Sequence, residues 1–214
     1  LTLDWFRPQR YYNLADWRGS WLNDGGVSTN QGIHYFDITN HLLGGFKNVF
    51  ARMRRIAVDI QCEDYLVAFF ELNSGLNLDV RMTTALRHPE EEASLVINGS
   101  KGTLKLHGVC CNKLLLTMGD GNKEVILGKG KKTEWGEEVE MPYGYGHKTM
   151  FKILLGEEEN KDLKLPDLEE SFSTMQFIFS CYESAITGNI SQPKFDYDKV
   201  PLGSINNKKI EFAE

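Results

Sequence analysis

The sequence has 214 residues, of which 41% are hydrophobic and 25% are charged, a composition typical of a soluble globular protein with a sizeable core. Its 24 basic and 30 acidic residues give a net charge of -6, which argues against a nucleic-acid-binding surface. No apolar run approaches the roughly 20 residues of a membrane-spanning helix. We therefore predict neither a nucleic-acid nor a membrane partner.

The N-terminal residues and the cysteines indicate a cytoplasmic protein. The opening residues, LTLDWFRPQR, lack the charged start and the apolar core of a signal peptide. No CxxC pair occurs, and we expect all four cysteines to be reduced and mostly buried: Cys62, Cys110, Cys111 and Cys181. The chain begins with Leu and not with Met, so we expect it to be part of a longer protein.

The first part of the chain predicts a strand, a polar and aromatic segment, and a helix. Residues 1–8 have the pattern of a strand that ends at Pro8. Paired glycines at 25–26 then precede a helical run, and a second glycine pair at 44–45 is a typical C-terminal stop.

Residues 46–130 have the character of antiparallel strands. Residues 76–83 alternate, which places Leu76, Leu78, Val80 and Met82 on one face of a half-buried strand. The segment SLVINGSKGTLKLHG predicts a hairpin, and NKLLLTMG and KEVILGKG predict two further strands. Consecutive antiparallel strands predict an antiparallel sheet with one face to be covered.

Two later helices supply this cover. The segment HKTMFKILLGEEEN predicts a short helix, and residues 166–188 predict the strongest helix of the chain, which starts at Pro166 and stops at Gly188. The apolar stripe of that helix is expected to be core: Leu168, Phe172, Met175, Phe179, Tyr182 and Ile186. Because strands and helices do not alternate as βαβ units, we predict the α+β class.

The sequence lacks the motifs of three common kinds of site. The segments YGYGHKT and GDGNKE lack the third glycine and the βαβ context of a dinucleotide site. His34, Asp37 and His41 could share a helix face, but no second cluster completes a coordination sphere, and we predict no metal. No GxSxG elbow for a nucleophilic serine occurs.

The helical run after residue 26 carries a narrow polar stripe. At about 100° per residue, Asn30, His34, Asp37 and His41 fall within an arc of about 60°. The stripe is either a solvated face or a ligand-facing one, since an unpaired buried polar group costs about 1–3 kcal/mol. His34 is the natural proton carrier of the set, because imidazole exchanges protons readily near neutral pH. Asn30 could bond a substrate hydroxyl or orient the His34 ring.

The segment before the glycines offers two further candidates. Arg18 could clamp a carboxylate or phosphate, or form a surface ion pair. The aromatic residues around it could form a stacking wall for a sugar ring or a plug of the core: Tyr11, Tyr12, Trp17 and Trp21.

These motifs resemble the C-terminal domain of the glucose–fructose oxidoreductase/inositol dehydrogenase/rhizopine-catabolism (Gfo/Idh/MocA) family. The family pattern is a Gly-rich turn, Asp or Asn, His, Asp and a Leu-Gly stop, and it matches residues 25–26, Asn30, His34, Asp37 and 43–44. The segments NGSKGTLKLHG, PYGYGHKTMF and SFSTMQFIFSCYESAITG extend the resemblance over nearly the whole chain. Asp24 departs from the pattern, where a third glycine is often found.

The resemblance implies that residues 1–214 are a single C-terminal substrate-binding and oligomerisation domain. An N-terminal Rossmann domain, absent from this chain, would hold NAD or NADP. The expected fold is an open, mostly antiparallel sheet with helices on one face and a homo-oligomer interface on the other. The NQGIH form resembles the nucleotide-sugar branch, which oxidises the 3-hydroxyl of UDP-N-acetylglucosaminuronate-type substrates for polysaccharide biosynthesis.

The resemblance also implies roles for single residues. His34 would be catalytic in proton transfer, beside a lysine of the other domain. Asn30, Arg18, Asp37, Tyr12 and His147 in the GYGH turn would contact the sugar substrate. Two alternatives stay open: an NAD-dependent glycosidase of the same superfamily, and a non-catalytic binding or assembly module.

Overall fold

The computed structural model describes residues 1–87, 92–108, 111, 113–118, 121–126, 131–132, 138–139, 146–157, 165–193, 198, 200–204 and 210–213. The chain divides into two compact units. The first comprises Leu1–Glu91 and Leu168–Glu214, and the second comprises Glu92–Asp167. Within the described ranges, no helix has the length and apolar character needed to cross a bilayer.

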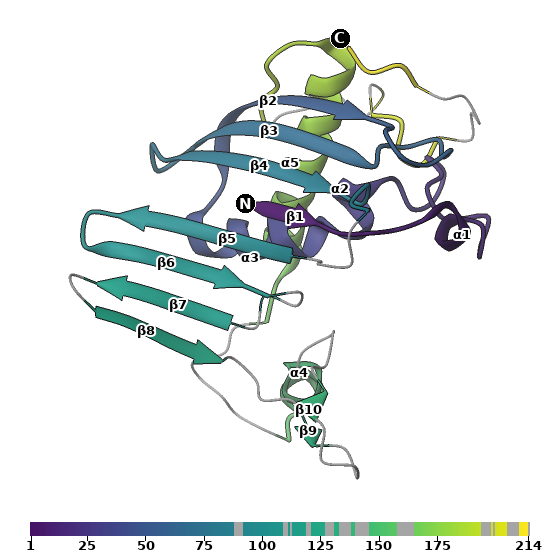
Figure 1. The fold of residues 1–214 in the computed structure, drawn as a ribbon. Coiled ribbons are helices and arrows are strands. Elements are labelled where there is room, and N and C mark those ends of the chain that lie inside the picture. Colours follow the sequence, from purple (N-terminus) through teal and green to yellow (C-terminus); the bar gives the residue numbers. More distant parts are fainter. Residues whose placement is uncertain are drawn as a thin grey trace. The chain divides into compact units, whose positions relative to one another are not determined.

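The first unit is built on a mixed, mostly antiparallel sheet (Figure 1). Its strands run in the order β2-β3-β4-β1, where β2, β3 and β4 pair antiparallel and β1 pairs parallel with β4. Their bounds are β1 Thr2–Asp4, β2 Phe46–Arg54, β3 Tyr65–Leu72 and β4 Asn77–Thr83. The predicted alternation of β4 is confirmed, since Leu78, Val80 and Met82 are buried, whereas Leu76 precedes the strand and is 46% exposed.

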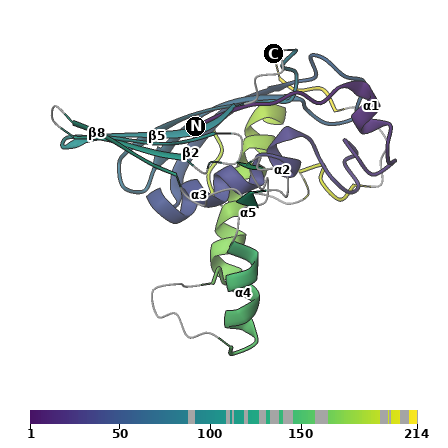
Figure 2. The same ribbon diagram turned by 60° about the horizontal axis from the view of Figure 1, so that its bottom comes forward.

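Helices of the first unit lie on one side of this sheet, as Figure 2 shows for α2, α3 and α5. The bounds are α1 Gln9–Tyr12, α2 Val27–Asn30, α3 Ile33–Leu43 and α5 Leu168–Thr187. The predicted single helical run after residue 26 is therefore two helices, with a break at residues 31–32. A Cβ at Gly32 would lie within 2.9 Å of two carbonyl oxygens of α2. The backbone at the break therefore packs closely against α2, and glycine leaves room for this contact. The predicted stop at Gly44 is confirmed by its φ of 80°.

Four phenylalanines join the helices to the sheet. Phe177 of α5 lies 4.6 Å from Phe46 of β2, 5.1 Å from Phe70 of β3 and 5.8 Å from Phe36 of α3, measured between ring centroids. All four side chains are at most 2% exposed. This cluster fixes α3, the helix that carries His34, against both α5 and the sheet.

The prediction for the buried face of α5 is wrong. Leu168 is 88% exposed and Phe172 is 48% exposed, and of the predicted stripe only Tyr182 is fully buried. The buried residues are Thr174, Phe177, Ile178, Ser180, Cys181, Tyr182, Ser184 and Ala185. Because α5 packs against β2 and also against α3, its buried surface is wider than one helical stripe and is centred elsewhere.

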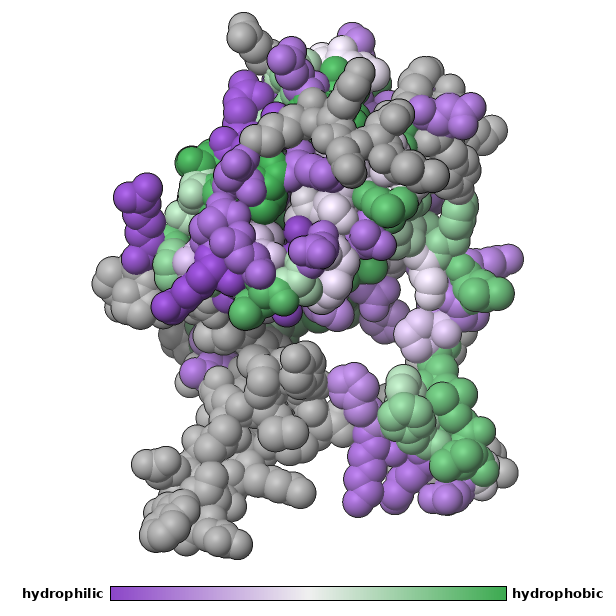
Figure 3. All heavy atoms as spheres, turned by 90° about the vertical axis from the view of Figure 1, so that its right-hand side faces the viewer, coloured by the Kyte–Doolittle hydropathy of each residue, from purple (hydrophilic) through white to green (hydrophobic). Residues whose placement is uncertain are grey.

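The second unit contains an antiparallel meander. Its elements are β5 Glu92–Gly99, β6 Gly102–His107, β7 Lys113–Met118, β8 Gly121–Ile126, β9 Lys131–Lys132, β10 Glu138–Val139 and α4 Gly146–Leu154. The register of Gly99 opposite Gly102 confirms the predicted hairpin. On α4, Phe151 and Leu154 are exposed, and hydrophobic and hydrophilic residues lie side by side in the lower part of Figure 3.

The predicted α+β class, with mostly antiparallel strands and helices on one face, is confirmed. The other face of the first unit's sheet carries two exposed aromatic side chains directly opposite each other, Phe50 and Phe69, at 39% and 48% exposure. Cys62, Cys111 and Cys181 are buried, reduced thiols, as predicted, and Cys110 lies outside the described residues.

Candidate functional site

The predicted glycine turn brings two distant parts of the chain into contact. Gly25 has a φ of 70°, in the left-handed region that favours glycine. A Cβ on Gly26 would lie 2.1 Å from the backbone oxygen of Glu63, so only glycine fits there. The turn therefore presses the start of α2 against the loop between β2 and β3.

Glu63 holds the start of α2. Its backbone oxygen accepts a hydrogen bond from the Val27 amide at 3.0 Å, and its Oε1 accepts one from the Ser28 amide at 3.0 Å. The Tyr182 hydroxyl donates to the same Oε1 at 3.1 Å and accepts from the Gly26 amide at 3.4 Å. Glu63 is completely buried, and this burial raises the pKa of its carboxyl to about 7.

Asn30, the last residue of α2, is held by two neighbours. Its Nδ2 donates to Asp24 Oδ1, and its Oδ1 accepts from Gln31 Nε2. Asp24 also accepts from the Gly19 amide at 3.3 Å. Burial raises the pKa of Asp24, and the Arg18 charge opposes that rise. Asp24 is thus a hydrogen-bond partner of Asn30. The sequence shows only that Asp24 replaces a glycine of the family pattern, and this does not predict the bond.

The members of the predicted polar stripe differ in their surroundings. His34, in the first turn of α3, is exposed, and none of the described residues hydrogen-bonds to its ring. The Asp37 Oδ1 accepts a hydrogen bond from the Thr174 hydroxyl of α5 at 2.8 Å. His41 is exposed near the end of α3. His34 is therefore accessible, and its role in proton transfer stays a prediction, while Asp37 ties α3 to α5.

Arg18 lies between two aromatic rings. Its guanidinium carbon is 3.9 Å from the Tyr11 ring centre and 4.8 Å from that of Trp17. Its Nε and Nη1 atoms are buried, and among the described residues they have no hydrogen-bond partner. Two donors of this cation are thus available to an anion.

Tyr12 lies in the core of the first unit, and its contact with a substrate stays a prediction. Its side chain is 7% exposed, and its hydroxyl is 3.0 Å from the Thr84 hydroxyl. Trp21, at 1% exposure, is also part of the core. Tyr12 and Trp21 therefore fill the core, as the core-plug alternative predicts, whereas Tyr11 and Trp17 contact Arg18, and a stacking contact with a sugar ring stays a prediction.

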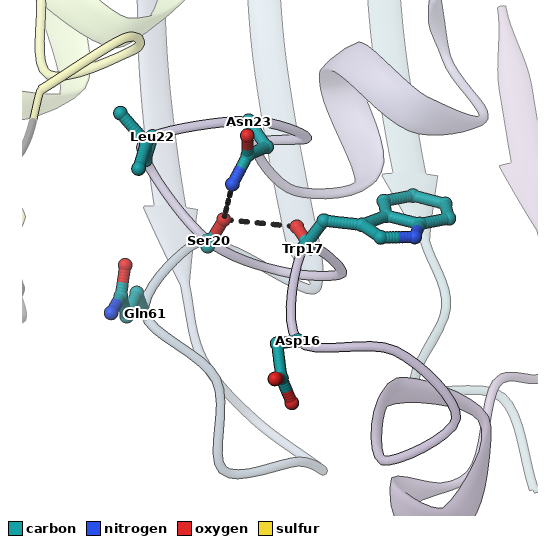
Figure 4. Close-up of a pocket in the computed structure, with 6 residues that line it drawn as sticks. All are labelled: Asp16, Trp17, Ser20, Leu22, Asn23 and Gln61. Atoms are coloured by element: carbon teal, nitrogen blue, oxygen red, sulfur yellow. Dashed lines mark hydrogen bonds between the residues drawn. The ribbon is translucent and has the colours of Figure 1, made fainter.

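An open pocket of about 660 Å³ lies on the loop that carries Arg18 (Figure 4). It is lined by Asp16, Trp17, Ser20, Leu22, Asn23 and Gln61. Ser20 donates to the Trp17 carbonyl at 2.9 Å and accepts from Asn23 at 3.2 Å, and the Trp17 ring points to the opposite side from Leu22 and Gln61. Side chains of this loop thus bond to one another, while the Arg18 donors and the Trp21 indole nitrogen have no partner among the described residues.

The other predicted ligand and substrate contacts fall elsewhere. His147 is exposed on α4 of the second unit, and residues 141–145 before it lie outside the described residues, so its contact with the substrate stays a prediction. Among the residues that the structure describes, no group of three or more His, Cys, Asp or Glu side chains could hold a metal ion.

The glycine turn does not fit a dinucleotide. A pyrophosphate site needs free amides at a helix start, and here Glu63 and Tyr182 already occupy the amides of Gly26, Val27 and Ser28. The buried carboxyl stands where a phosphate would have to lie, and like-charge repulsion would exclude it. The described residues therefore offer no phosphate cradle at this turn.

Comparison with known proteins identifies related domains. Residues 2–191 match the model of the oxidoreductase family, C-terminal alpha/beta domain. The WlbA dehydrogenase from Bordetella pertussis, in complex with NADH and UDP-GlcNAcA, is 28% identical and has a TM-score of 0.68 over 91% of this chain. The WlbA dehydrogenase from Chromobacterium violaceum, with the same ligands, is 26% identical and has a TM-score of 0.70 over 92%.

Other similarities are restricted to the fold. A levoglucosan dehydrogenase in complex with NADH and levoglucosan is 17% identical over 91% of this chain and 57% of its own, with a TM-score of 0.67. The present chain spans about half of the WlbA structures, 54% and 55% of their lengths. Comparison with curated proteins gives no match.

Proposed function

The chain belongs to the Gfo/Idh/MocA oxidoreductase family, and from this premise we propose that it is the substrate-binding and catalytic half of an NAD(P)-dependent nucleotide-sugar dehydrogenase. The longer protein would hold NAD or NADP mainly in another domain, since the glycine turn here does not fit a dinucleotide. It would act in the cytoplasm, in polysaccharide biosynthesis.

The observation that carries this proposal is the position of His34. The imidazole is exposed at the start of α3 and has no hydrogen-bond partner among the described residues. In the sequence it follows closely after Asp24, Asn30 and Gln31, whose side chains bond to one another. A bound nicotinamide supplies the hydride acceptor. A ring nitrogen of His34 takes the proton of the sugar hydroxyl as that carbon is oxidised, and Asn30 stabilises the turn beside it.

Arg18 supports an anionic substrate. Two buried guanidinium donors without a partner favour an anionic group, and a guanidinium fork suits the two oxygens of a carboxylate or phosphate. A nucleotide sugar with a uronic acid carries both groups. The two WlbA structures contain UDP-GlcNAcA, which supports this compound as the first substrate to test.

The test is a pair of histidine variants in the full-length protein. With UDP-GlcNAcA and NAD as substrates, we expect His34→Ala to lower kcat by about 10²- to 10⁴-fold, the usual contribution of a positioned proton acceptor. His41→Ala is the matched control, because His41 is exposed on the same helix and we expect its loss to leave kcat unchanged. NADH absorbance gives the rate.

The outcomes separate the alternatives. Unchanged turnover in His34→Ala would contradict the catalytic role of this residue. Release of free sugar without net NADH would indicate the glycosidase. Neither reaction with any nucleotide sugar, in a folded full-length protein, would indicate a binding or assembly module.

A further inference from the structure

We propose that Glu63 is a positioning residue of the substrate site, which fixes α2 by holding three successive backbone amides and thereby sets Asn30 and the start of α3. The Val27 amide donates to the Glu63 backbone oxygen and the Ser28 amide to the Glu63 carboxylate. The Gly26 amide donates to the Tyr182 hydroxyl, which in turn donates to the carboxylate. The kinetic part of this inference rests on the proposed function; the structural part does not.

The need for such a residue follows from the length of α2. A helix of four residues is too short to be stable by its own hydrogen bonds. The residue at its N-cap is Gly26, which has no side chain to cap the first amides, and the structure has no local side-chain cap there. Glu63, 35 residues away from Ser28, supplies the missing acceptors.

A continuous set of backbone bonds connects this anchor to His34. The Asn30 amide donates to the Gly26 carbonyl at 3.0 Å, and the Gly32 amide donates to the Val27 carbonyl at 2.7 Å. The carbonyl of Gly32 then accepts from the Phe36 amide at 3.0 Å in the first turn of α3. A displacement of Gly26 and Val27 therefore moves both Asn30 and the turn that presents His34.

The surroundings of Glu63 indicate that its carboxyl is not kept for stability. The carboxyl is completely buried, and its Oε2 has no hydrogen-bond partner among the described residues. The titratable groups that feel its charge are Cys62 in its own loop, Tyr12, and Cys181 and Tyr182 on α5, and no cation is among the groups that shift the pKa of Glu63. A buried carboxyl without a cation costs stability, so its retention fits a positioning role better than a stabilising one.

Two substitutions separate hydrogen bonding from packing. Glu63→Met preserves much of the volume but removes both side-chain oxygens, and Glu63→Gln keeps one oxygen as an acceptor. Ile178→Val is the matched control, since Ile178 is a fully buried residue of α5 and is not bonded to the α2 amides. Tyr182→Phe removes only the hydroxyl between Gly26 and Glu63, and it replaces Glu63→Met if that variant does not fold.

The first readout is amide hydrogen exchange in the full-length protein. We expect Glu63→Met, and to a smaller extent Tyr182→Phe, to accelerate exchange in residues 26–31 while β2, β3 and β4 stay protected. Glu63→Gln should restore protection, and Ile178→Val should leave residues 26–31 unchanged. Equal exchange of this segment in wild type, Glu63→Met and Tyr182→Phe would overturn the proposal, whatever the protein catalyses.

The second readout is the division of the kinetic effect. With UDP-GlcNAcA, we expect Glu63→Met to lower kcat about tenfold, which corresponds to about 1.4 kcal/mol, because the turn that presents His34 moves, and to change KM by less than about twofold. Glu63→Gln should return kcat to within about twofold of wild type. An unchanged kcat in a Glu63→Met enzyme whose residues 26–31 exchange faster would also overturn the proposal. A wild-type protein without turnover refutes the proposed function instead, and the exchange readout still decides for Glu63.

Discussion

The Glu63 carboxyl lies among groups that can also ionise. Burial first, and then the nearby Glu63 charge, raise the pKa values of Cys62, Cys181 and Tyr182 above their ordinary values. The two thiols therefore stay protonated at neutral pH and are poor nucleophiles. At the scale of single residues, Glu63 is therefore the member of this set of four side chains whose charge changes near neutral pH.

This change of charge predicts a pH-dependent stability. The folded protein protonates Glu63 at a pKa of about 7, raised by burial, and the unfolded chain at the ordinary value of 4.5. The folded state therefore binds more protons between these values, so the contribution to stability is full below about pH 4.5 and is lost as pH rises through about 7. The span corresponds to about 3 kcal/mol.

Thermal unfolding of the full-length protein at pH 5 and pH 8 checks this prediction. We expect wild type to lose stability relative to Glu63→Gln on going to pH 8, because the amide cannot ionise. Glu71→Gln is the control: the hydrogen bond from Asn48 and the contact with Lys47 lower the pKa of this exposed carboxyl, so it is ionised at both pH values. Parallel pH curves for wild type and Glu63→Gln would contradict the assignment.

At the scale of secondary-structure elements, α3 is held from two sides. Phe36 packs it against Phe70 and Phe177, and Asp37 accepts a hydrogen bond from Thr174 of α5. The helix that presents His34 is thus fixed by apolar contacts on one side and by a polar contact across the helix pair. Loss of the α5 ring at the centre of this cluster should release α3.

Phe177→Ala tests this arrangement. We expect a loss of about 3–5 kcal/mol in the free energy of unfolding, because a fully buried ring is replaced by a cavity. Phe172→Ala, on the same helix at 48% exposure, should change it by less than about 0.5 kcal/mol. Urea denaturation measures both. Similar losses for the two variants would mean that α5 buries the face that its apolar periodicity predicts.

Local patterns in the sequence predict part of this arrangement. The alternation of β4, the hairpin of β5 and β6, and the glycine stop of α3 follow from neighbouring residues, and so do His34 and Asn30 as members of one motif. The buried face of α5 and the anchor at Glu63 depend on partners far along the chain. Thr174 is 137 residues from Asp37, and Tyr182 is 119 from Glu63, distances over which periodicity carries no information.

At the scale of the whole molecule, the sheet face opposite the helices of the first unit is the proposed contact between subunits. Phe50 and Phe69 face each other across β2 and β3 and are exposed, while the buried face of the same strands packs on α5. An open face with aromatic residues is typical of a surface that another subunit covers.

Phe69→Glu tests the contact. We expect the oligomer of the full-length protein to dissociate, because a charge buried at a subunit interface without a partner is unfavourable. Leu14→Glu is the control, since Leu14 is 75% exposed on the loop after α1 and away from this face. Analytical ultracentrifugation gives the mass of each variant. An oligomer that survives Phe69→Glu would place the interface on another surface.

The bond between Gly26 and Tyr182 also sets an order of events in the cell. These residues are 156 positions apart, so the hydroxyl that completes the anchor of α2 is synthesised long after the turn that it holds. On the ribosome, the emerging chain contains the glycine turn, His34 and the whole sheet of the first unit before α5 has been made. The anchor of α2 therefore cannot form during translation until α5 has emerged, and a protein truncated before α5 would be released without it.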